Sequence, residues 1–367
     1  MTNRNKHENI ERGCLCLGFI EERGEALLKE ALLLHASDIH AMPRQHDAII
    51  QFRIQHRLVV KEKIPITIFE KLVSHFKFLA GMDIGEKRRP QNGSIQMLVD
   101  ERTISLRLST LPTLQHESLV IRILPQNIDS RLTELSLFPH ATKVLFSLAL
   151  RSTGLIILTG PTGSGKTTTL YSLIHAVQQT LDCNIITLED PIEKRIDTGC
   201  LQVQVNEKAG ITYATGLKAI LRHDPDIIMV GEIRDEETAK AAVRASLTGH
   251  LVLTTLHTKN TKSAINRLVD LGVSLQDIEQ TLICVTSQRL VNLKCPYCNG
   301  PCSIHCLKRR KVNRLCVYEI LHGENLKEVI KEAKGEAGNY QYKTLNELIN
   351  KGVALGYLPV ESHGVKL

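Results

Sequence analysis

The amino-acid sequence predicts an α/β protein in which a mixed α+β region precedes a parallel sheet, with helices at the C-terminal end. Two observations support this prediction. Between residues 155 and 271, short apolar runs alternate with segments of helical spacing, the order typical of a parallel sheet with helices on both faces. A glycine-rich turn follows the first of these runs and precedes a helical segment, which is the context of a phosphate-binding loop.

Length and composition indicate an ordinary globular protein of two or three domains. The 367 residues are 43% hydrophobic and carry a formal net charge of +7, which decides little about the partners. Residues 1–13 lack the apolar core of a secretion signal, and no later apolar run is long enough to cross a membrane. We therefore expect the chain to stay in the cytoplasm.

The first region, expected to end at Leu124, has the pattern of an α+β domain. Residues 25–35 and 68–80 repeat apolar side chains at helical spacing, which predicts two helices. Residues 49–60 and 95–108 have strand character. Between them we expect a tight turn with positive φ at the Asn-Gly of Gln91-Asn-Gly-Ser94.

Two arginines of this region stand inside apolar strand sequences. Arg107 lies between two leucines, and Arg122 lies between two isoleucines. A guanidinium in such a place needs a carboxylate or a phosphate as its partner. We expect both arginines to have one.

The short polar segment Pro125–Arg131 is the best candidate for a linker, because its proline ends the preceding strand. The predicted organisation is an N-terminal domain of residues 1–124, a linker of residues 125–131, a nucleotide-binding core of residues 132–290 and a C-terminal region of residues 291–367. In the last region, helices are expected around residues 326–330 and 345–349.

The most specific motif begins at Gly160, directly after the apolar run 155–158. It satisfies G-x-x-x-x-G-K-[ST], in which small residues allow backbone N–H groups to surround a triphosphate. We expect Lys166 to neutralise the β- and γ-phosphates, Thr167 to bind Mg²⁺, and a helix over residues 168–179 to direct its N-terminus at the phosphates. The predicted nucleotide-binding residues are Gly160, Pro161, Thr162, Gly163, Ser164, Gly165, Lys166, Thr167 and Thr168.

Carboxylates follow the predicted strand at residues 185–188. Glu189, Asp190 and Glu193 stand within five residues at the carboxyl end of this strand, where ligands of parallel sheets bind. They could hold a hydrated Mg²⁺ or a water molecule, since Mg²⁺ prefers oxygen ligands. An acidic surface turn is the alternative.

Another carboxylate, that of Glu232, follows the predicted strand at residues 227–230. Gly231 occupies the place where many phosphate-loop enzymes have a metal-binding aspartate, so the metal ligand must lie elsewhere. Glu232 is left to orient or deprotonate the attacking water. His250 and His257 flank the next strand. A buried histidine is usually part of the core, but these two are candidates for sensing the γ-phosphate.

Four of the ten cysteines lie close together near the end of the predicted core. Cys295, Cys298, Cys302 and Cys306 fall within twelve residues, and soft ligands at such spacing favour tetrahedral Zn²⁺. His305 or Cys316 could replace one of them. Reduced structural thiols are the alternative.

Six segments in collinear order resemble the secretion and type IV pilus traffic ATPases. The resemblance covers residues 25–320, and the absence of an earlier matched motif suggests a compact member of the competence-pilus assembly kind. The segments are Ala36–His40, Ala80–Gly93, Arg107–Thr113, Thr187–Glu193, Leu221–Asp235 and Gly249–Thr258.

The resemblance implies a PAS-like N-terminal domain and a RecA-like domain that assembles into a hexameric ring. It implies that ATP binds between the two domains and that Arg107 and Arg122 reach the nucleotide, with Arg234 reporting its presence. Glu232 becomes the catalytic carboxylate, and Glu189 and Glu193 belong to the metal and water network. The predicted catalytic set is Glu232, Lys166, Glu193, Glu189, His257, Arg107, Arg122 and Arg234, with Mg²⁺ on Thr167, Glu189 and Asp190.

The function implied by the resemblance is an ATP-driven motor that assembles pilin-like subunits for DNA uptake. Its partners would be other copies of the chain and a polytopic inner-membrane platform protein, with the motor peripheral on the inner face of the membrane. A general secretion or pilus-retraction ATPase is one alternative, and a nucleotide-gated scaffold that scarcely hydrolyses ATP is another. A DNA-binding translocase with a zinc ribbon is a third, but aromatic residues make up only 4% of the chain and tryptophan is absent, so direct contact with nucleic acid is not expected.

Overall fold

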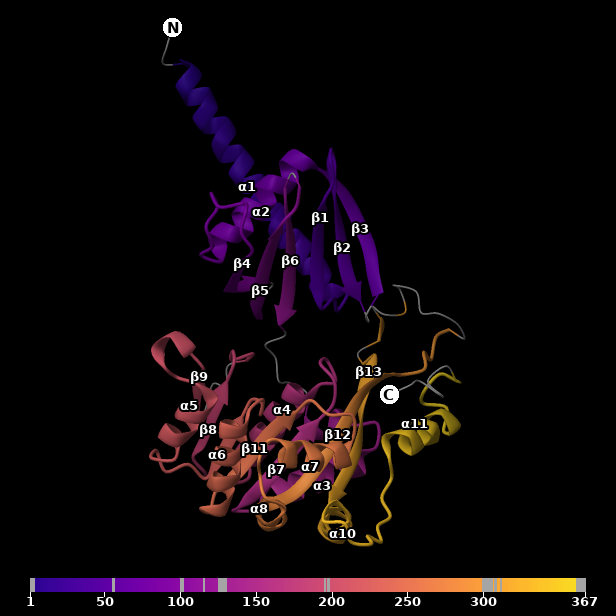
Figure 1. The fold of residues 1–367 in the computed structure, drawn as a ribbon. Helices are drawn as coiled ribbons and strands as arrows, with labels where there is room; N and C mark the ends of the chain where they lie inside the picture. Colours follow the sequence, from indigo (N-terminus) through magenta and orange to yellow (C-terminus); the bar gives the residue numbers. More distant parts are fainter. Residues whose placement is uncertain are drawn as a thin grey trace. The chain divides into compact units, whose positions relative to one another are not determined.

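The computed structural model describes residues 4–360 except 55–56, 100–101, 115, 125–130, 195, 197–198, 299–305, 307–308 and 311, and it describes only the backbone of residues 4–17, 102–103 and 208. The chain divides into two compact units (Figure 1). The N-terminal unit comprises residues 1–126 with 302–309, and the C-terminal unit comprises residues 127–301 with 310–367. The predicted linker falls almost wholly outside the described residues, and the predicted domain boundaries stay a prediction.

The N-terminal unit is built on one antiparallel sheet with strand order β3-β2-β1-β6-β5-β4. Alternate residues of its strands are buried, as in Leu119, Ile121 and Ile123 of β6, and they share one core with Phe69 and Phe76 of α2. The elements are α1 (Arg4–Leu33), β1 (Asp38–Pro43), β2 (Asp47–Ile54), β3 (Arg57–Pro65), α2 (Ile66–Leu79), β4 (Gln91–Val99), β5 (Arg102–Pro112) and β6 (Glu117–Leu124).

Helix α1 contains the predicted helical segment 25–35 except its last two residues, and it begins far earlier than expected. Helix α2 confirms the predicted helix at residues 68–80 to within two residues. Each of the two predicted strand stretches is in fact a pair of neighbouring antiparallel strands, β2 with β3 and β4 with β5. Among the described residues, no helix is long and apolar enough to cross a membrane.

The predicted turn at residues 91–94 is wrong. These residues form the first half of β4, where Asn92 pairs with Ser109 and Gly93 pairs with Leu108. Gly93 does not have the positive φ of a turn. A Cβ atom at Gly93 would lie 2.9 Å from the Ala80 Cβ and 2.8 Å from the Met82 Cγ, so the glycine permits close packing of the segment that follows α2.

The C-terminal unit is built on a mixed sheet with strand order β13-β12-β7-β11-β10-β8-β9, in which every pair is parallel except β12 with β13. The strands are β7 (Gly154–Thr159), β8 (Ile185–Glu189), β9 (Cys200–Gln204), β10 (Ile227–Val230), β11 (Leu251–Leu256), β12 (Leu282–Asn292) and β13 (Arg314–His322). The helices are η1 (Leu132–Glu134), α3 (Pro139–Ala149), α4 (Lys166–Gln178), η2 (Glu207–Ala209), α5 (Tyr213–Ile220), α6 (Glu236–Leu247), α7 (Thr261–Asp270), α8 (Leu275–Thr281), α10 (Gly323–Ala333) and α11 (Leu345–Ala354).

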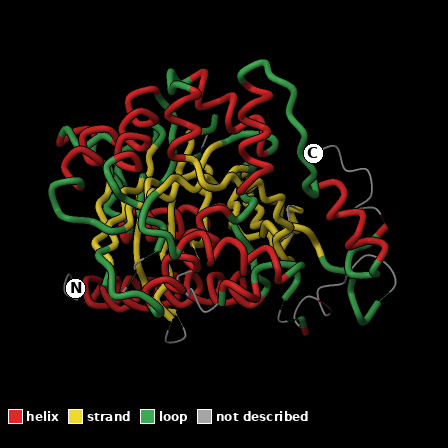
Figure 2. Tube along the Cα trace, turned by 90° about the horizontal axis from the view of Figure 1, so that it is seen from below, coloured by secondary structure: helices red, strands yellow, loops and turns green. Residues whose placement is uncertain are grey.

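Helices cover both faces of this sheet (Figure 2). All six residues of β7 are buried, as expected for a parallel strand covered on both sides. Ile156 and Leu158 join the core formed with α3 and α4, whereas Leu155 and Ile157 join the core formed with α5, α6, α7 and α8. The fold class predicted from the sequence is confirmed.

One part of the C-terminal region was not predicted. The structure adds the antiparallel pair β12 and β13 to the parallel sheet, and the sequence predicted no strand at either segment. The two expected helices are present as α10 and α11. A short apolar run such as the one in β13 can form either a buried strand or a helix. Here the pairing with β12 makes it a strand.

Candidate nucleotide site

The phosphate-binding loop has the local context that its motif requires. It leaves the carboxyl end of β7 and leads directly into α4, which begins at Lys166. Gly160, Gly163 and Gly165 have φ values of 144°, 78° and 89°, which residues with a Cβ atom rarely adopt. The helix N-terminus and its free N–H groups therefore lie where an anion would be stabilised.

Lys166 is buried at this loop, and no described carboxylate forms an ion pair with it. Only 8% of the residue is exposed, and its Nζ atom donates to the carbonyl oxygens of Gly160 at 2.8 Å and Pro161 at 3.1 Å. Burial lowers the pKa of Lys166 to about 8. Within the described part of the chain, Lys166 forms no ion pair, so the site fits a group that brings negative charge, such as a triphosphate.

Strand β12 also contacts the phosphate-binding loop, which the sequence did not predict. Ser287 of β12 pairs with Thr159 of β7, and this register places Gln288 alongside the loop. The Gln288 Nε2 atom donates to the Ser164 carbonyl oxygen at 2.7 Å. Among the described residues, the Ser164 Oγ atom of the loop and the Gln288 Oε1 atom of β12 are buried and have no hydrogen-bond partner, as expected of polar groups that a ligand completes.

Three of the predicted catalytic residues lie together after β10 and β11. The Glu232 Oε1 atom accepts a hydrogen bond from Arg234 at 2.6 Å, and its Oε2 atom lies 3.4 Å from the His257 Nε2 atom. The bond from Arg234 lowers the pKa of Glu232, so the carboxylate is ionised. Burial and the charge of Lys166 lower the pKa of His257, which keeps the imidazole neutral at pH 7.

His250 does not join this group. It precedes β11 whereas His257 follows it, so the two histidines lie at opposite ends of the strand. The His250 Nδ1 atom lies 3.0 Å from the Ala245 carbonyl oxygen. The expectation that His250 senses the γ-phosphate is therefore wrong, because the phosphate-binding loop follows the carboxyl end of the parallel strand β7.

Glu189 lies in a closed hydrogen-bond network. The carboxylate is 3% exposed, and it accepts hydrogen bonds from Tyr171, from Thr187 at 2.7 Å and from Gln202 at 3.2 Å. Burial raises the pKa of Glu189. By contrast, Asp190 is partly exposed, and its Oδ2 atom lies 3.8 Å from the guanidinium of Arg234.

The N-terminal unit contains a second concentration of positive charge. In its sheet, Arg53 pairs with Asp38, Asp38 pairs with Arg122, and Arg122 pairs with Arg107. Arg122 donates to the Asp38 Oδ1 atom at 2.8 Å, and the Arg53 Nε atom lies 3.6 Å from the Asp38 Oδ2 atom. The Arg107 Nη2 atom is buried without a partner. Arg122 thus has the expected carboxylate, whereas Arg107 has none among the described residues.

Three of the four predicted zinc ligands lie together. The Sγ atoms of Cys295, Cys298 and Cys306 are within 4.8 Å of one another, which fits a soft metal ion. Cys302 and His305 lie outside the described residues. Cys316 is not an alternative ligand, because its buried Sγ atom lies 3.8 Å from the Ser164 carbonyl oxygen at the phosphate-binding loop.

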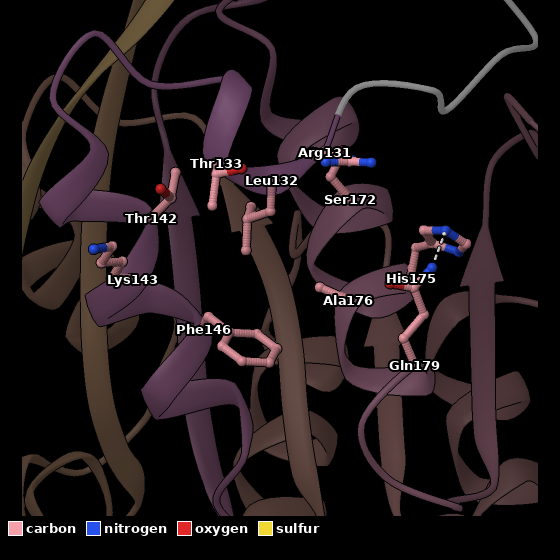
Figure 3. A pocket seen from close by; sticks show the side chains of 10 residues that line it. All are labelled: Arg131, Leu132, Thr133, Thr142, Lys143, Phe146, Ser172, His175, Ala176 and Gln179. Carbon is pink, nitrogen blue, oxygen red and sulfur yellow. Dashed lines mark hydrogen bonds between the residues drawn. The ribbon is translucent and has the colours of Figure 1, made fainter.

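A separate pocket of about 520 Å³ lies between η1, α3 and α4 (Figure 3). Its lining contains three basic side chains and no carboxylate, and none of the predicted site residues belongs to it. The pocket is thus distinct from the phosphate-binding loop. The lining residues are Arg131, Leu132, Thr133, Thr142, Lys143, Phe146, Ser172, His175, Ala176 and Gln179.

A phosphate-binding loop on a largely parallel sheet, with an ionised glutamate after a nearby strand, defines the class of phosphate-loop nucleotide hydrolases. The chain belongs to the family described as Type II/IV secretion system protein, whose profile matches residues 16–361. This confirms the resemblance stated above, and the chain is an ATPase of this family.

Similar proteins and structures agree. The chain is 54% identical over 345 residues to the competence protein ComGA of Bacillus subtilis, covering 94% of this chain and 97% of the relative. It is 44% identical over 279 residues to the type II secretion system protein E of Pseudomonas aeruginosa, covering 75% of this chain and 55% of the relative. The pilus retraction motor PilT with bound ADP has a TM-score of 0.68 at 29% identity, with 92% and 95% of the two chains covered. The ATPase DotB of Legionella pneumophila shares the fold, with a TM-score of 0.72, 21% identity, and 91% and 92% of the two chains covered.

Proposed function

We propose that this ATPase drives the assembly of a competence pilus or pseudopilus for DNA uptake. It acts as a homo-hexamer on a polytopic membrane platform protein at the inner face of the cell membrane and does not contact nucleic acid itself. The observation that carries the ATP site is Lys166, a buried cation whose hydrogen-bond partners within the described residues are loop carbonyls. The extended similarity to ComGA supports the competence role.

In the proposed mechanism, residues 160–168 surround the phosphates and Lys166 exchanges its carbonyl partners for phosphate oxygens. Mg²⁺ would be held by the Thr167 hydroxyl with carboxylates of the segment after β8, and it would neutralise charge on the phosphates. Glu232 is ionised and orients or deprotonates the attacking water, as a general base requires. Neutral His257 can accept or donate one hydrogen bond beside it.

The hydrogen bonds that Glu189 accepts change the role that we assign to it. Its hydrogen bonds from Tyr171, Thr187 and Gln202 leave Asp190 and Glu193 as the more available carboxylates of this segment. We assign the metal and water network to Asp190 and Glu193, and we assign to Glu189 the positioning of the segment that carries them.

The arginines of the N-terminal unit are proposed to contact the nucleotide. The guanidinia of Arg53 and Arg122 share the carboxylate of Asp38. Arg107 lies directly opposite Arg122 on the neighbouring strand, and like charges in such a pair are unfavourable without an anion. Arg107 and Arg122 would supply charge-assisted contacts, which are worth orders of magnitude in phosphoryl transfer.

Zinc is proposed to stabilise the cysteine segment through Cys295, Cys298 and Cys306, with Cys302 as the fourth ligand. Three thiols within 4.8 Å of one another fit a tetrahedral site. Metal analysis of the purified full chain tests this, and loss of bound zinc in a Cys295→Ser variant is the expected result. Bound zinc would also count against a retraction motor.

Two measurements test the proposed function. The ATPase activity of the purified chain should be lost in Lys166→Ala, and unchanged activity would refute the ATP site. Affinity capture from membranes should recover a platform protein of the competence apparatus. Recovery of a platform protein for secretion, or turnover that DNA stimulates, would instead support the alternative clients. Absence of turnover with the platform present would indicate a nucleotide-gated scaffold.

A further inference from the structure

Arg289 brings a second cation to the phosphate-binding loop. It follows Gln288 on β12, and its Nη1 atom donates to the Gln288 carbonyl oxygen at 2.9 Å. The Nη2 atom donates to the Lys259 carbonyl oxygen at 3.2 Å. A Cβ atom on Gly160 would lie 3.2 Å from the Arg289 Nη1 atom, so the guanidinium lies directly against the first glycine of the loop.

This guanidinium has no carboxylate partner in the part of the chain that the structure describes. The nearby carboxylate of Glu319 raises the pKa of Arg289 only as a secondary effect. The Glu319 oxygens accept hydrogen bonds from the side chain and backbone of Thr261 and from the backbone of Leu345. Within the described residues, the acceptors of Arg289 are therefore carbonyl oxygens, and they occupy two of its five N–H donors.

Lys166 resembles Arg289 in this respect, because its hydrogen-bond acceptors among the described residues are also carbonyl oxygens. Burial is the main cause that lowers the pKa of Lys166, and the charge of Arg289 lowers it further, whereas the Glu232 carboxylate raises it. The two cations therefore repel each other across the loop. Neither cation forms an ion pair among the described residues, so an anion that binds between the two would stabilise both.

We propose that Arg289 binds the outermost phosphate of the nucleotide and thereby makes the site prefer the triphosphate to the diphosphate. This inference rests on the proposed ATP site. The Arg289 Nη2 atom reaches the Lys259 carbonyl oxygen, two residues after His257, whose ring lies beside Glu232. The guanidinium is thus on the side of the loop where the attacking water is expected, and exchanging carbonyls for phosphate oxygens gains charge-assisted hydrogen bonds.

A purely structural role is the competing explanation, in which Arg289 only ties the end of β12 to the segment after β11. The test compares Arg289→Gln and Arg289→Lys in the full chain, both in a Glu232→Gln background that slows hydrolysis. Arg267→Gln is the matched control, because Arg267 is exposed on α7. Calorimetry gives the affinities for ATP and for ADP, and thermal unfolding without nucleotide reports on the fold.

We expect Arg289→Gln to weaken ATP binding by about tenfold to a hundredfold, as for loss of a charged hydrogen bond, and ADP binding by less than about threefold. The ATP affinity of Arg289→Lys should fall between that of Arg289→Gln and that of the unsubstituted background, and Arg267→Gln should leave it unchanged.

Unchanged ATP affinity in Arg289→Gln overturns the inference. An equal loss of affinity for ATP and ADP together with a lower unfolding temperature also overturns it. If Arg289→Gln does not fold, a Lys variant with an unchanged ratio of ATP to ADP affinity overturns it. Failure of the unsubstituted background to bind either nucleotide refutes the proposed ATP site itself.

Discussion

Each of the two units buries a lysine, and the partners of the two lysines differ. In the N-terminal unit, Lys77 on α2 is 1% exposed and its Nζ atom lies 2.9 Å from the carboxylate of Glu117, which is also buried. In the C-terminal unit, the acceptors of Lys166 among the described residues are the carbonyls of its own loop. A buried cation with a buried carboxylate is complete within the fold, whereas a buried cation on carbonyls indicates a ligand that brings the charge.

The arginines show the same contrast. Arg122 has the carboxylate of Asp38, whereas Arg289 has carbonyls. Arg107 belongs with Arg289 by this criterion, because its Nη2 atom is buried and has no hydrogen-bond partner among the described residues. The difference separates Lys77, whose loss should damage the fold, from Lys166 and Arg289, whose loss should damage binding or turnover.

The largest effect is expected for Lys166→Ala. ATP turnover should fall by at least about a thousandfold, because a charge is removed from the phosphates in the transition state. The free energy of unfolding without nucleotide should change by less than about 1 kcal/mol, since no ion pair is broken. Steady-state turnover and chemical denaturation check both parts. Lys240→Ala, an exposed lysine on α6, is the control, and a large loss of stability in Lys166→Ala would break the comparison.

Glu232→Gln should lower turnover by about a hundredfold or more, as expected for loss of a general base. The affinity for ATP should change little, because the amide keeps the shape and no positive charge leaves the site. Turnover and equilibrium ATP binding are measured side by side, with Glu236→Gln on the exposed surface of α6 as the control. An ATP affinity that falls as much as turnover would place Glu232 in binding instead of catalysis.

The N-terminal unit should respond in the opposite way. Lys77→Met leaves the buried Glu117 carboxylate unpaired, and breaking a buried pair in this way costs about 3–5 kcal/mol. Hydrogen exchange of the β6 amides in the full chain measures the opening free energy. The double variant Lys77→Met, Glu117→Leu should recover most of the loss, because both charges are then absent. Unchanged exchange in the single variant would show that the pair does not stabilise the sheet.

The sequence predicted the parts of the site that are local. The phosphate-binding loop is a continuous motif between a strand and a helix, and Glu232 directly follows a strand that was itself predicted. The position of Arg107 between two leucines also indicated a charge that needs a partner. Such features depend on neighbours in the chain, so the sequence contains them.

The parts that the sequence did not predict depend on pairing between distant segments. Gln288 and Arg289 reach the loop because Ser287 pairs with Thr159, and nothing near residue 288 in the sequence indicates that register. The sequence predicted Glu189 as a candidate for the metal and water network, and it gave no sign of the partners Tyr171 and Gln202, which come from α4 and β9. Gly93 was read as a turn residue because glycine also serves close packing, which only the fold reveals.

The smallest expected effect is the dependence of ATP affinity on pH. The pKa of Lys166 without nucleotide is about 8, lowered first by burial, and the phosphates of a bound nucleotide should raise it. Below pH 8 the lysine is already charged, so affinity stays constant. Above pH 8 the free site loses its charge, binding must take up a proton, and the dissociation constant should rise by up to about tenfold per pH unit. The phosphates themselves, with a second pKa near 6, are fully ionised in this range. Glu232 and His257 have lowered pKa values and do not titrate there.

Calorimetry at pH 8.5 in two buffers of different ionisation enthalpy should detect proton uptake on ATP binding. A constant affinity from pH 7.5 to 9.5 would show that Lys166 keeps its charge without a ligand.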